Sequence, residues 1–305
     1  MNEALVSIII PTYYRNESLT DAIECSLRQT HDRTEVIVVD DSGEAHARPV
    51  VEEYEEDSLQ YIPHEENQGG NPARNTGYEA ARGDYIQFLD DDDEIFPSKI
   101  EKQVSVIESS PDVGVAYGGI VDRDGARRLP RPSEQGRSLE LALQFFWPTT
   151  ITSSLLISDE VLSSVYPLQN RSAADDIGMK IELAKRTQFD YVDEVLTRIG
   201  DSTDSRSGGM EYVSELEAIL DEYQREYDEF PAVVRRNALS DTYRTKARVL
   251  LDERIWSASA VYYYLLALTN KREFDPILIL SILASLFGRP GIIISRRIYK
   301  RAVSS

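Results

Sequence analysis

Four consecutive aspartates, Asp90 to Asp93, follow the apolar stretch YIQFL. Adjacent carboxylates repel one another, so such a run needs either full solvation or a ligand that neutralises its charge. A divalent cation with a phosphate group on its far side would neutralise it, because hard cations such as Mg²⁺ take oxygen ligands. On an extended segment, residues two apart project to the same side, so Asp90 and Asp92 can face one ligand while Asp91 faces elsewhere. The alternative is a solvated loop that caps the next helix.

The composition excludes other kinds of site. The chain has one cysteine, Cys25, and three scattered histidines, so it offers neither a disulfide framework nor a zinc-like ligand cluster. Any metal is therefore expected to be a hard cation held by oxygen. The net charge of −20 opposes general nucleic-acid binding, which requires a basic surface. The sequence also contains no P-loop and no Gly-rich nucleotidyltransferase loop.

The elements that must position these aspartates alternate between two kinds. Apolar runs predict strands, and segments with helical spacing predict helices between them. The strands are expected at residues 5–10, 35–41, 59–63, 84–90, 113–121, 150–158 and 189–200, and the helices at 17–29, 49–56, 71–83, 97–111 and 176–187. Runs that are apolar on both faces and separated by helices indicate an α/β fold, with a mostly parallel, Rossmann-like sheet covered by helices.

In such sheets, ligands bind beyond the carboxyl ends of the strands. Three groups of residues fall at such ends: Pro11 to Tyr13, Asp40 with Asp41, and Asp90 to Asp92. The sequence therefore predicts one site where these strand ends meet.

The chain changes character after about residue 210, where helices are expected at 211–227, 231–252, 255–270 and 275–287. The segment SRSGG at 205–209 suits a boundary between domains. We expect an α/β domain over residues 1–205 and a helical region over 206–305, with a mobile loop at 122–138.

Three blocks of the sequence resemble the family 2 glycosyltransferases, inverting enzymes with the GT-A fold. VSIIIPTYYRNESLTDAIECSLRQTHDRTEVIVVDDS is similar to the opening of that family, NQGGNPARNTGYEAARGDYIQFLDDDDEIFPSKI to its second block and AADDIGMKIELAKR to its third. The chain departs from the family pattern at two points: Tyr14 stands where Asn is usual, and the Gly before Ser42 is missing. The resemblance covers residues 5–200 and implies that a GT-A catalytic domain transfers a sugar from a nucleotide donor to an acceptor hydroxyl.

The resemblance places a metal site in the aspartate run. Asp92 falls on the family's metal-binding aspartate, and Asp90 falls on the first aspartate of its Asp-x-Asp motif, near the ribose and the metal. The expected cofactor is Mn²⁺ or Mg²⁺, which neutralises the leaving diphosphate as a Lewis acid. Arg74 is expected to face the donor phosphates, because a guanidinium binds them in a bidentate manner. The alternative for Arg74 is a structural salt bridge to a nearby carboxylate.

The resemblance also implies a nucleotide-binding pocket and a base. Asp41 would accept from the uracil N–H, with Pro11 and Tyr13 forming the pocket and Tyr13 stacking on the base. A UDP-sugar is then the preferred donor over a GDP- or dTDP-sugar, unless Asp41 only forms the turn after its strand. Asp176 matches the catalytic aspartate that takes the proton of the acceptor hydroxyl. Its place at a helix N-terminus favours the ionised form, so the alternative is a simple N-cap.

The last residues, 276–305, suggest a partner. This segment contains five basic residues and no acidic one, after an apolar run too short to span a bilayer. The pattern suits a helix that lies in an anionic membrane interface, although an appendage packed on the catalytic domain or a dimer interface is also possible. We therefore expect a polyprenol- or dolichol-linked glycan acceptor, in protein N-glycosylation or surface polysaccharide assembly. The alternatives are a soluble or protein acceptor, or a non-catalytic nucleotide-binding module.

Two further expectations concern the surroundings of the protein. The acidic composition, with 7 lysines against 26 arginines, resembles proteins of salt-loving archaea, the alternative being an ordinary acidic protein. No signal-peptide pattern and no run of about 18 apolar residues occurs, which predicts a cytoplasmic protein, peripheral on the cytoplasmic face of the membrane. The acceptor-channel motif Gln-x-x-Arg-Trp of processive family members is missing, which favours single additions.

Overall fold

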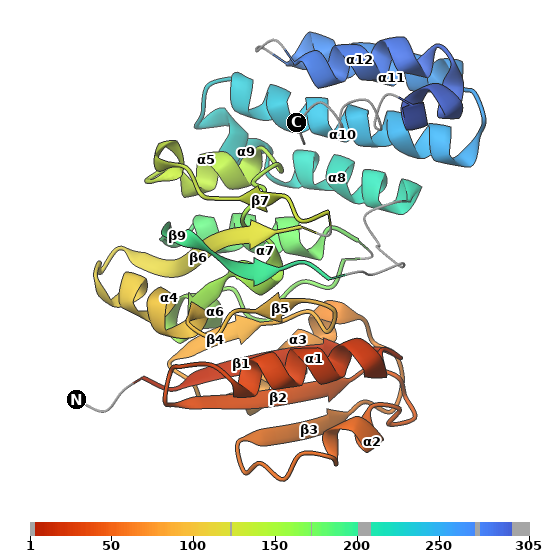
Figure 1. The fold of residues 1–305 in the computed structure, drawn as a ribbon. Helices are drawn as coiled ribbons and strands as arrows, with labels where there is room; N and C mark the ends of the chain where they lie inside the picture. The colour runs from red at the N-terminus through yellow and green to blue at the C-terminus, as the bar shows by residue number, and fades with distance from the viewer. Residues whose placement is uncertain (1–3, 123, 172, 201–208, 272–274, 295–305) are drawn as a thin grey trace. The chain divides into compact units, whose positions relative to one another are not determined.

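The computed structural model describes residues 4–122, 124–171, 173–200, 209–271 and 275–294 (Figure 1). The chain forms two compact units. The sheet unit comprises residues 1–139, 147–171 and 175–204, and the helical unit comprises 140–146, 172–174 and 205–305. The boundary expected at residue 205 lies outside the described residues and stays a prediction.

The described part of the sheet unit contains one nine-stranded sheet with the order β3-β2-β1-β4-β8-β6-β9-β5, and β7 pairs with β6. The strands are β1 Val6–Thr12, β2 Thr34–Asp40, β3 Leu59–Pro63, β4 Tyr85–Phe88, β5 Glu94–Ile95, β6 Val113–Val121, β7 Arg127–Arg128, β8 Leu156–Ser158 and β9 Gln188–Arg198. Strands β3, β2, β1 and β4 are parallel, as predicted. Strand β8 is antiparallel to both β4 and β6, so the sheet as a whole is mixed.

The helices of the sheet unit are α1 Asn16–Leu27, α2 Arg48–Val51, α3 Gly70–Ala80, α4 Lys99–Glu108, α6 Asp159–Ser163 and α7 Asp175–Ala184, and α5 Ser138–Leu143 begins in this unit. Helices α1, α3, α4 and α7 lie within three residues of the predicted ranges, and the short α5 and α6 were not predicted. Helix α2 is shorter than the predicted 49–56 because a run of acidic residues follows it, and negative charge at a helix C-terminus opposes the helix dipole. Strand β8 is shorter than the predicted 150–158 because Thr152–Ser154 form a 3₁₀ turn.

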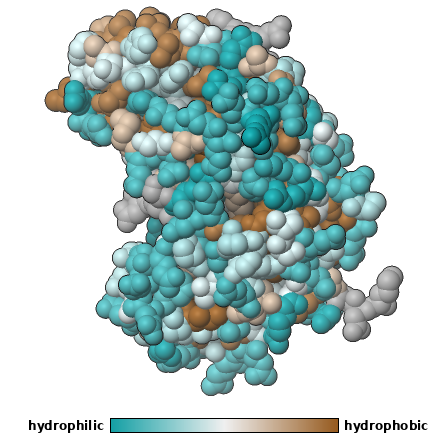
Figure 2. All heavy atoms as spheres, turned by 180° about the vertical axis from the view of Figure 1, so that it is seen from behind, coloured by the Kyte–Doolittle hydropathy of each residue, from teal (hydrophilic) through white to brown (hydrophobic). Residues whose placement is uncertain are grey.

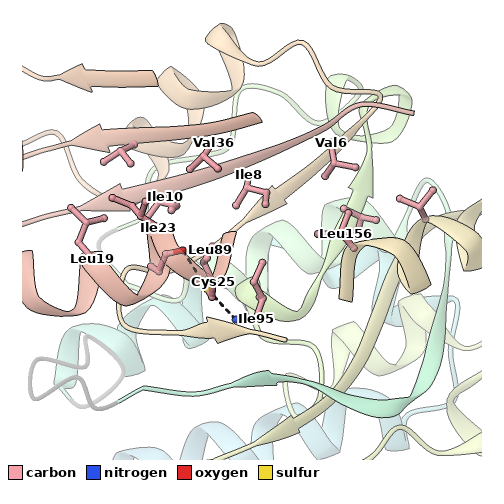
Figure 3. Packing of buried hydrophobic residues seen from close by; sticks show 14 of the residues in the cluster. Val6, Ile8, Ile10, Leu19, Ile23, Cys25, Val36, Leu89, Ile95 and Leu156 are labelled. Atoms are coloured by element: carbon pink, nitrogen blue, oxygen red, sulfur yellow. Dashed lines mark hydrogen bonds between the residues drawn. The ribbon is translucent and has the colours of Figure 1, made fainter. Parts of the chain in front are cut away.

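Strands β1 and β2 are apolar on both faces because helices cover both sides of the sheet. On one face, Ile8 and Ile10 of β1 pack with Leu19 and Ile23 of α1 (Figure 3). On the other face, Ile9 of β1 and Val39 of β2 meet helix α3 at Gly77, where an added Cβ would lie 2.3 Å from Ile9. The small glycine therefore lets α3 approach the sheet closely. Helices α1 and α3 thus hold β1 and β2 from opposite faces of the sheet.

The helical unit contains α8 Met210–Glu222, α9 Gln224–Asp228, α10 Val233–Glu253, α11 Ala258–Asn270 and α12 Pro276–Ser285. Its core includes Ala247 of α10, Tyr264 of α11 and Leu278 of α12. Within the described ranges, no helix is both long and apolar enough to cross a bilayer. Figure 2 shows apolar side chains exposed on the part of the surface formed by α11 and α12.

Candidate active site

The structure brings the predicted strand ends together at one edge of the sheet. Thr12 of β1 pairs with Asp40 of β2, and the amide of Asp41 donates to the Thr12 carbonyl at 2.9 Å. On the other side of β1, the amide of Leu89, just before the aspartate run, donates to the Ile9 carbonyl at 2.9 Å. The loops that follow β1, β2 and β4 are therefore neighbours, as the sequence predicted.

Asp91 holds the aspartate loop in place. It is buried, and its carboxylate accepts a hydrogen bond from the Thr12 hydroxyl at 2.8 Å and one from the Arg15 guanidinium at 3.0 Å. Burial raises the pKa of Asp91 to about 6, although both partners act in the opposite direction. Asp91 thus faces the protein rather than a ligand.

Asp93 is the second buried anchor of this loop. Its carboxylate accepts from the amide of Gly200, just after β9, at 3.0 Å. Burial and the nearby charge of Asp90 raise the pKa of Asp93. A Cβ added at Gly200 would lie 1.4 Å from the Asp92 carbonyl oxygen, so only glycine lets the two backbones meet. The end of β9 therefore helps to shape the loop.

Asp90 pairs with Arg74 of helix α3 at 2.6 Å, and the Asp90 amide donates to the Ser153 hydroxyl at 3.0 Å. Arg74 is buried and also donates to the Asn71 side chain at 3.0 Å. Its Nε is a buried donor with no partner among the described residues. The observed geometry is thus the salt bridge named as the alternative, and a contact between Arg74 and donor phosphates stays a prediction.

Asp90 and Asp92 are the two partly exposed aspartates of the run, and Asp92 makes the weaker contact with the rest of the protein. Its side chain is 14% exposed, and its Oδ2 lies 3.5 Å from the Arg15 guanidinium. Among the described residues, no three His, Cys, Asp or Glu side chains converge on one point. Mg²⁺ is commonly held by one or two carboxylates, with phosphate and water oxygens completing its shell. Asp92 with Asp90 therefore offers the type of donor set that such a cation takes from a protein.

Asp41 is buried and does more than form a turn. Its carboxylate accepts from His64 Nδ1 at 2.7 Å and from the amides of Gln68 and Gly69 at 2.9 and 2.8 Å. His64 in turn contacts the Thr76 hydroxyl of α3 at 2.9 Å through Nε2. A carboxylate has about four lone-pair sites, so these three bonds leave Asp41 room for one more donor.

The turn after β2 is instead closed by Asp40, whose carboxylate accepts from the amides of Ser42 and Ala47 and from the Tyr61 hydroxyl. Pro11 lies near the end of β1, and Tyr13 follows that strand with an exposed ring. Pro11, Tyr13 and Asp41 are therefore neighbours at one edge of the sheet, while their binding of a base stays a prediction.

Asp176 is the second residue of helix α7, and its side chain is 41% exposed. The ammonium group of the buried Lys180, one turn along the helix, lies 3.3 Å from its carboxylate. The neighbouring Asp175 is buried and accepts from the amide of Arg171 at 2.9 Å. Of the two acidic residues at this helix start, Asp176 is therefore the exposed one, and its role as the base stays a prediction.

Helix α3 joins the aspartate loop to the segment that leads to Asp176. Besides placing Arg74 on Asp90, α3 binds residues 168–169 through two asparagines. Asn71 donates to the Gln169 carbonyl at 2.7 Å, and Asn75 exchanges two hydrogen bonds with the backbone of Leu168 at 2.8 and 3.0 Å.

Sequence reasoning missed several residues that organise the site: Arg15, His64, Ser153, Lys180 and Gly200. The partners of Arg15, His64, Ser153 and Gly200 are far away in the sequence, so no spacing rule points to them. Lys180 differs, because it lies four residues after Asp176 on the same helix, a spacing that does predict contact. Arg15 offered one weak signal, since a single basic residue just beyond a strand end is well placed to balance several carboxylates.

Comparison with known proteins agrees with this architecture. A family model described as Glycosyl transferase family 2 matches residues 7–178. An uncharacterized glycosyltransferase of Haemophilus influenzae is 39% identical over 113 residues, which is 37% of this chain and 38% of that protein. The UDP-Glc:alpha-D-GlcNAc-diphosphoundecaprenol beta-1,3-glucosyltransferase WfgD of Escherichia coli is 33% identical over 118 residues, 39% of this chain and 46% of that protein. The match thus covers less than half the length of either relative.

Solved structures show the same fold. S. aureus TarS in complex with UDP-GlcNAc gives a TM-score of 0.59 at 17% identity, covering 88% of this chain and 89% of that chain. The mannosyltransferase PcManGT from Pyrobaculum calidifontis, in complex with GDP-Man and Mn²⁺, also gives 0.59, at 16% identity, covering 97% of this chain and 84% of that one. The chain belongs to glycosyl transferase family 2, and its α/β fold with a C-terminal helical region is of the GT-A type predicted from the sequence.

Proposed function

We propose that this protein is an inverting glycosyltransferase that moves a sugar from a nucleotide-sugar donor, preferably a UDP-sugar, to a hydroxyl group of a glycan acceptor. The observation that carries this proposal is the arrangement of the aspartate loop. Asp91 and Asp93 are buried and hold the loop, which leaves Asp90 and Asp92 partly exposed at the edge where β1, β2 and β4 end. A loop that only caps a helix would not bury two carboxylates, because burial of a charge is costly.

Asp92, with Asp90 beside it, would hold a divalent cation between the loop and the donor diphosphate. When bound, the cation stabilises the leaving diphosphate as a Lewis acid. The Mn²⁺ in the related mannosyltransferase complex supports this cofactor. The guanidinium groups of Arg15 and Arg74 add fixed positive charge beside the two aspartates. Both arginines therefore favour a negatively charged ligand at this edge.

The donor base would lie against Pro11 and Tyr13, with Asp41 accepting the uracil N–H. His64 and two backbone amides hold the Asp41 carboxylate in one orientation, so its remaining acceptor position is fixed in advance. The UDP-sugars in the names of WfgD and of the TarS complex support a UDP donor. The GDP-Man in the mannosyltransferase complex makes a GDP-sugar the donor to test against it.

Asp176 would act as the general base. The acceptor oxygen attacks the anomeric carbon, the bond from that carbon to the diphosphate breaks, and the hydroxyl proton passes to the Asp176 carboxylate. Attack from the side opposite the diphosphate inverts the configuration. Lys180 positions the carboxylate at the start of α7.

The acceptor is proposed to be a lipid-linked glycan, met at the cytoplasmic surface of an anionic membrane. In the helical unit, Ile255, Trp256, Leu286 and Phe287 form an apolar corner whose members are between 53% and 78% exposed. The Trp256 indole donates to the Leu286 carbonyl at 3.1 Å, and the amide of Arg289 donates to the Ile255 carbonyl at 2.8 Å. A rigid apolar corner that contains a tryptophan and precedes a basic tail suits an anionic lipid surface. The lipid-linked acceptor in the name of WfgD agrees with this.

The central test is a screen of UDP-, GDP- and dTDP-sugars with Mn²⁺ or Mg²⁺, in dilute buffer and in molar KCl, scored by nucleotide release. We expect release of UDP that is stimulated by a lipid extract and abolished by EDTA. A preference for GDP would overturn the donor, and stimulation only by water-soluble sugars would overturn the lipid-linked acceptor. Nucleotide binding without release under any condition would favour the non-catalytic nucleotide-binding module, and neither binding nor release would overturn the proposed function.

The membrane surface is tested separately by sedimentation with vesicles. Ile255→Ser combined with Phe287→Ser should release the protein from anionic vesicles without lowering its unfolding midpoint, because both side chains are exposed. Leu129→Ser, an exposed apolar change in the sheet unit, serves as the matched control and should leave sedimentation unchanged. Equal sedimentation of all three proteins would contradict the proposal, and a fall in apparent mass of the double variant would indicate self-association instead.

A further inference from the structure

Tyr14, directly after the exposed Tyr13, has a backbone that a tyrosine rarely adopts. Its φ is +54°, in the left-handed region that favours glycine and asparagine and is costly for bulky residues. A residue stays in such a conformation only where its surroundings hold it there, and such residues gather at functional sites. Contacts of Tyr14 must therefore offset the conformational strain of its backbone.

Burial does not offset this strain, because the Tyr14 side chain is 45% exposed and Tyr13 is 49% exposed. The Tyr14 ring instead makes specific contacts with two other rings, those of Tyr13 and His46. Its centroid lies 4.7 Å from that of Tyr13, with the rings at 87°, and 4.7 Å from that of His46, with the rings at 53°. The strained backbone therefore turns the Tyr14 ring onto Tyr13 and toward the loop after β2.

The residues of the loop after β2 that contact Tyr14 are themselves held by hydrogen bonds. The Tyr14 hydroxyl donates to the Ser42 carbonyl at 3.3 Å, and Ser42 Oγ accepts from the amide of His46 at 3.1 Å. Asn16 of α1 holds His46, since its amide group donates to the His46 carbonyl at 3.2 Å and its Oδ1 lies 3.0 Å from His46 Nδ1. Tyr14, which stands where the family usually has Asn, thus contacts Ser42, the residue before which the family's Gly is missing.

We propose that Tyr14 is a positioning residue that sets nucleotide affinity: it holds the Tyr13 ring beside Asp41, so that an open face of Tyr13 stacks on the donor base. The inference rests on the proposed function, which places the base on Tyr13. An edge-to-face contact covers at most one face of a ring, so the other face of Tyr13 remains available. A ring held in one orientation loses less freedom when it stacks, which strengthens binding.

The backbone strain makes this role separable from a purely structural one. Tyr14→Asn places a residue that tolerates φ > 0 at this position and removes the ring. A positioning role predicts an unfolding midpoint equal to or above that of the native protein, together with weaker nucleotide binding. If Tyr14 instead has a purely structural role and holds the two loops together, both the nucleotide affinity and the unfolding midpoint should fall.

The experiment measures thermal unfolding and the binding of UMP without metal, which isolates the base and ribose from the cation site. It is run in dilute buffer and in molar KCl. We expect Tyr14→Asn to weaken UMP binding about tenfold, the scale of one aromatic stacking contact. Tyr14→Phe should restore most of that loss, since it keeps the ring. In NMR spectra, the upfield shift that Tyr13 induces on the uracil H5 and H6 protons should shrink in Tyr14→Asn.

Ala45→Gly is the matched control, because Ala45 in the facing loop also has a positive φ, +57°, and carries no ring. It should keep the native UMP affinity with an unchanged or raised midpoint. Native UMP affinity in Tyr14→Asn would overturn the inference, and so would a midpoint that falls together with affinity. If the native protein binds no uracil, guanine or thymine nucleotide in either buffer, the proposed function itself fails.

Discussion

At the scale of single residues, burial divides the four aspartates into two groups. Two are buried and hold the loop in place, and two are partly exposed and can contact a ligand. Asp91 and Asp93 accept from Thr12, Arg15 and the Gly200 amide, and each is almost fully buried. Among the described residues, the Asp92 carboxylate has a loose contact with Arg15 at 3.5 Å. Replacing a partly exposed carboxylate such as Asp92 should therefore affect ligand binding without affecting folding.

Asp92→Asn gives the first prediction. The change should lower metal-dependent nucleotide release by about a hundredfold or more, the scale on which removal of a key electrostatic group acts. The free energy of unfolding should change by less than about 1 kcal/mol, because Asn keeps the shape of the side chain and only a loose ion pair with Arg15 is lost. Glu94→Gln, an exposed carboxylate two residues further on that pairs with Arg198, is the control and should keep native release. Native turnover in Asp92→Asn would reject its assignment as the metal ligand.

Cys25 of α1 gives a second prediction at this scale. Burial raises the pKa of its thiol to about 11, and its Sγ lies among the core residues shown in Figure 3, near the Ile95 amide. Because the thiolate is the reactive form and a raised pKa keeps it scarce, the native protein should not react with a thiol reagent at pH 8. Reaction should begin only as denaturant unfolds the sheet unit. Rapid labelling of the native protein would show that α1 opens readily.

At the scale of elements, α3 does more than cover the sheet. It places Arg74 on Asp90, presents Thr76 to His64 and fastens residues 168–169, which precede Asp176. One helix therefore contacts both the loops of the predicted donor site and the segment that precedes the predicted base. A weakened contact on α3 should disturb catalysis without removing any group that touches a ligand.

Asn75→Ala tests this role of α3. It removes two hydrogen bonds to Leu168 and leaves that backbone unpaired, which should lower the free energy of unfolding by about 1–3 kcal/mol. Turnover should fall more than nucleotide affinity, since the loss lies on the Asp176 side of the helix. Tyr78→Phe, which removes an exposed hydrogen bond to Asp159 from the same helix, is the control and should change both quantities little. Equal losses of affinity and turnover in Asn75→Ala would contradict the idea.

For the whole molecule, charge is the dominant property. A net charge of −20 on 305 residues repels itself in dilute solution. Salt reduces this repulsion, because the Debye length falls from about 10 Å at 0.1 M to about 3 Å at 1 M. Many acidic side chains of the described residues are exposed to solvent.

The corresponding prediction concerns the unfolding midpoint in KCl. The midpoint should rise between 0.1 and 2 M KCl, and activity should rise with it. Sucrose of equal osmolality is the control, since it acts by exclusion from the surface and does not screen charge. An unchanged or falling midpoint in KCl, with full activity in dilute buffer, would refute adaptation to high salt.

Much of the fold was predictable because it follows from local patterns. Continuous apolar runs marked β1, β2 and β6, and helical spacing marked α1 and α7. The antiparallel placement of β8 was not predictable, because the direction of a strand depends on the path of the chain around it. The polar network that surrounds the fully buried Lys99, with Gln87 and Gln103, also left no local signal.

The sequence by itself determined that Pro11, Asp41 and the aspartate run stand at the carboxyl ends of parallel strands, since strand ends and crossovers follow from the order of apolar runs. Only the tertiary structure decided which carboxylates are anchors and which remain available. That decision depends on partners such as Thr12 and Gly200, which are far from the aspartates in sequence and meet them only when β1, β4 and β9 have packed.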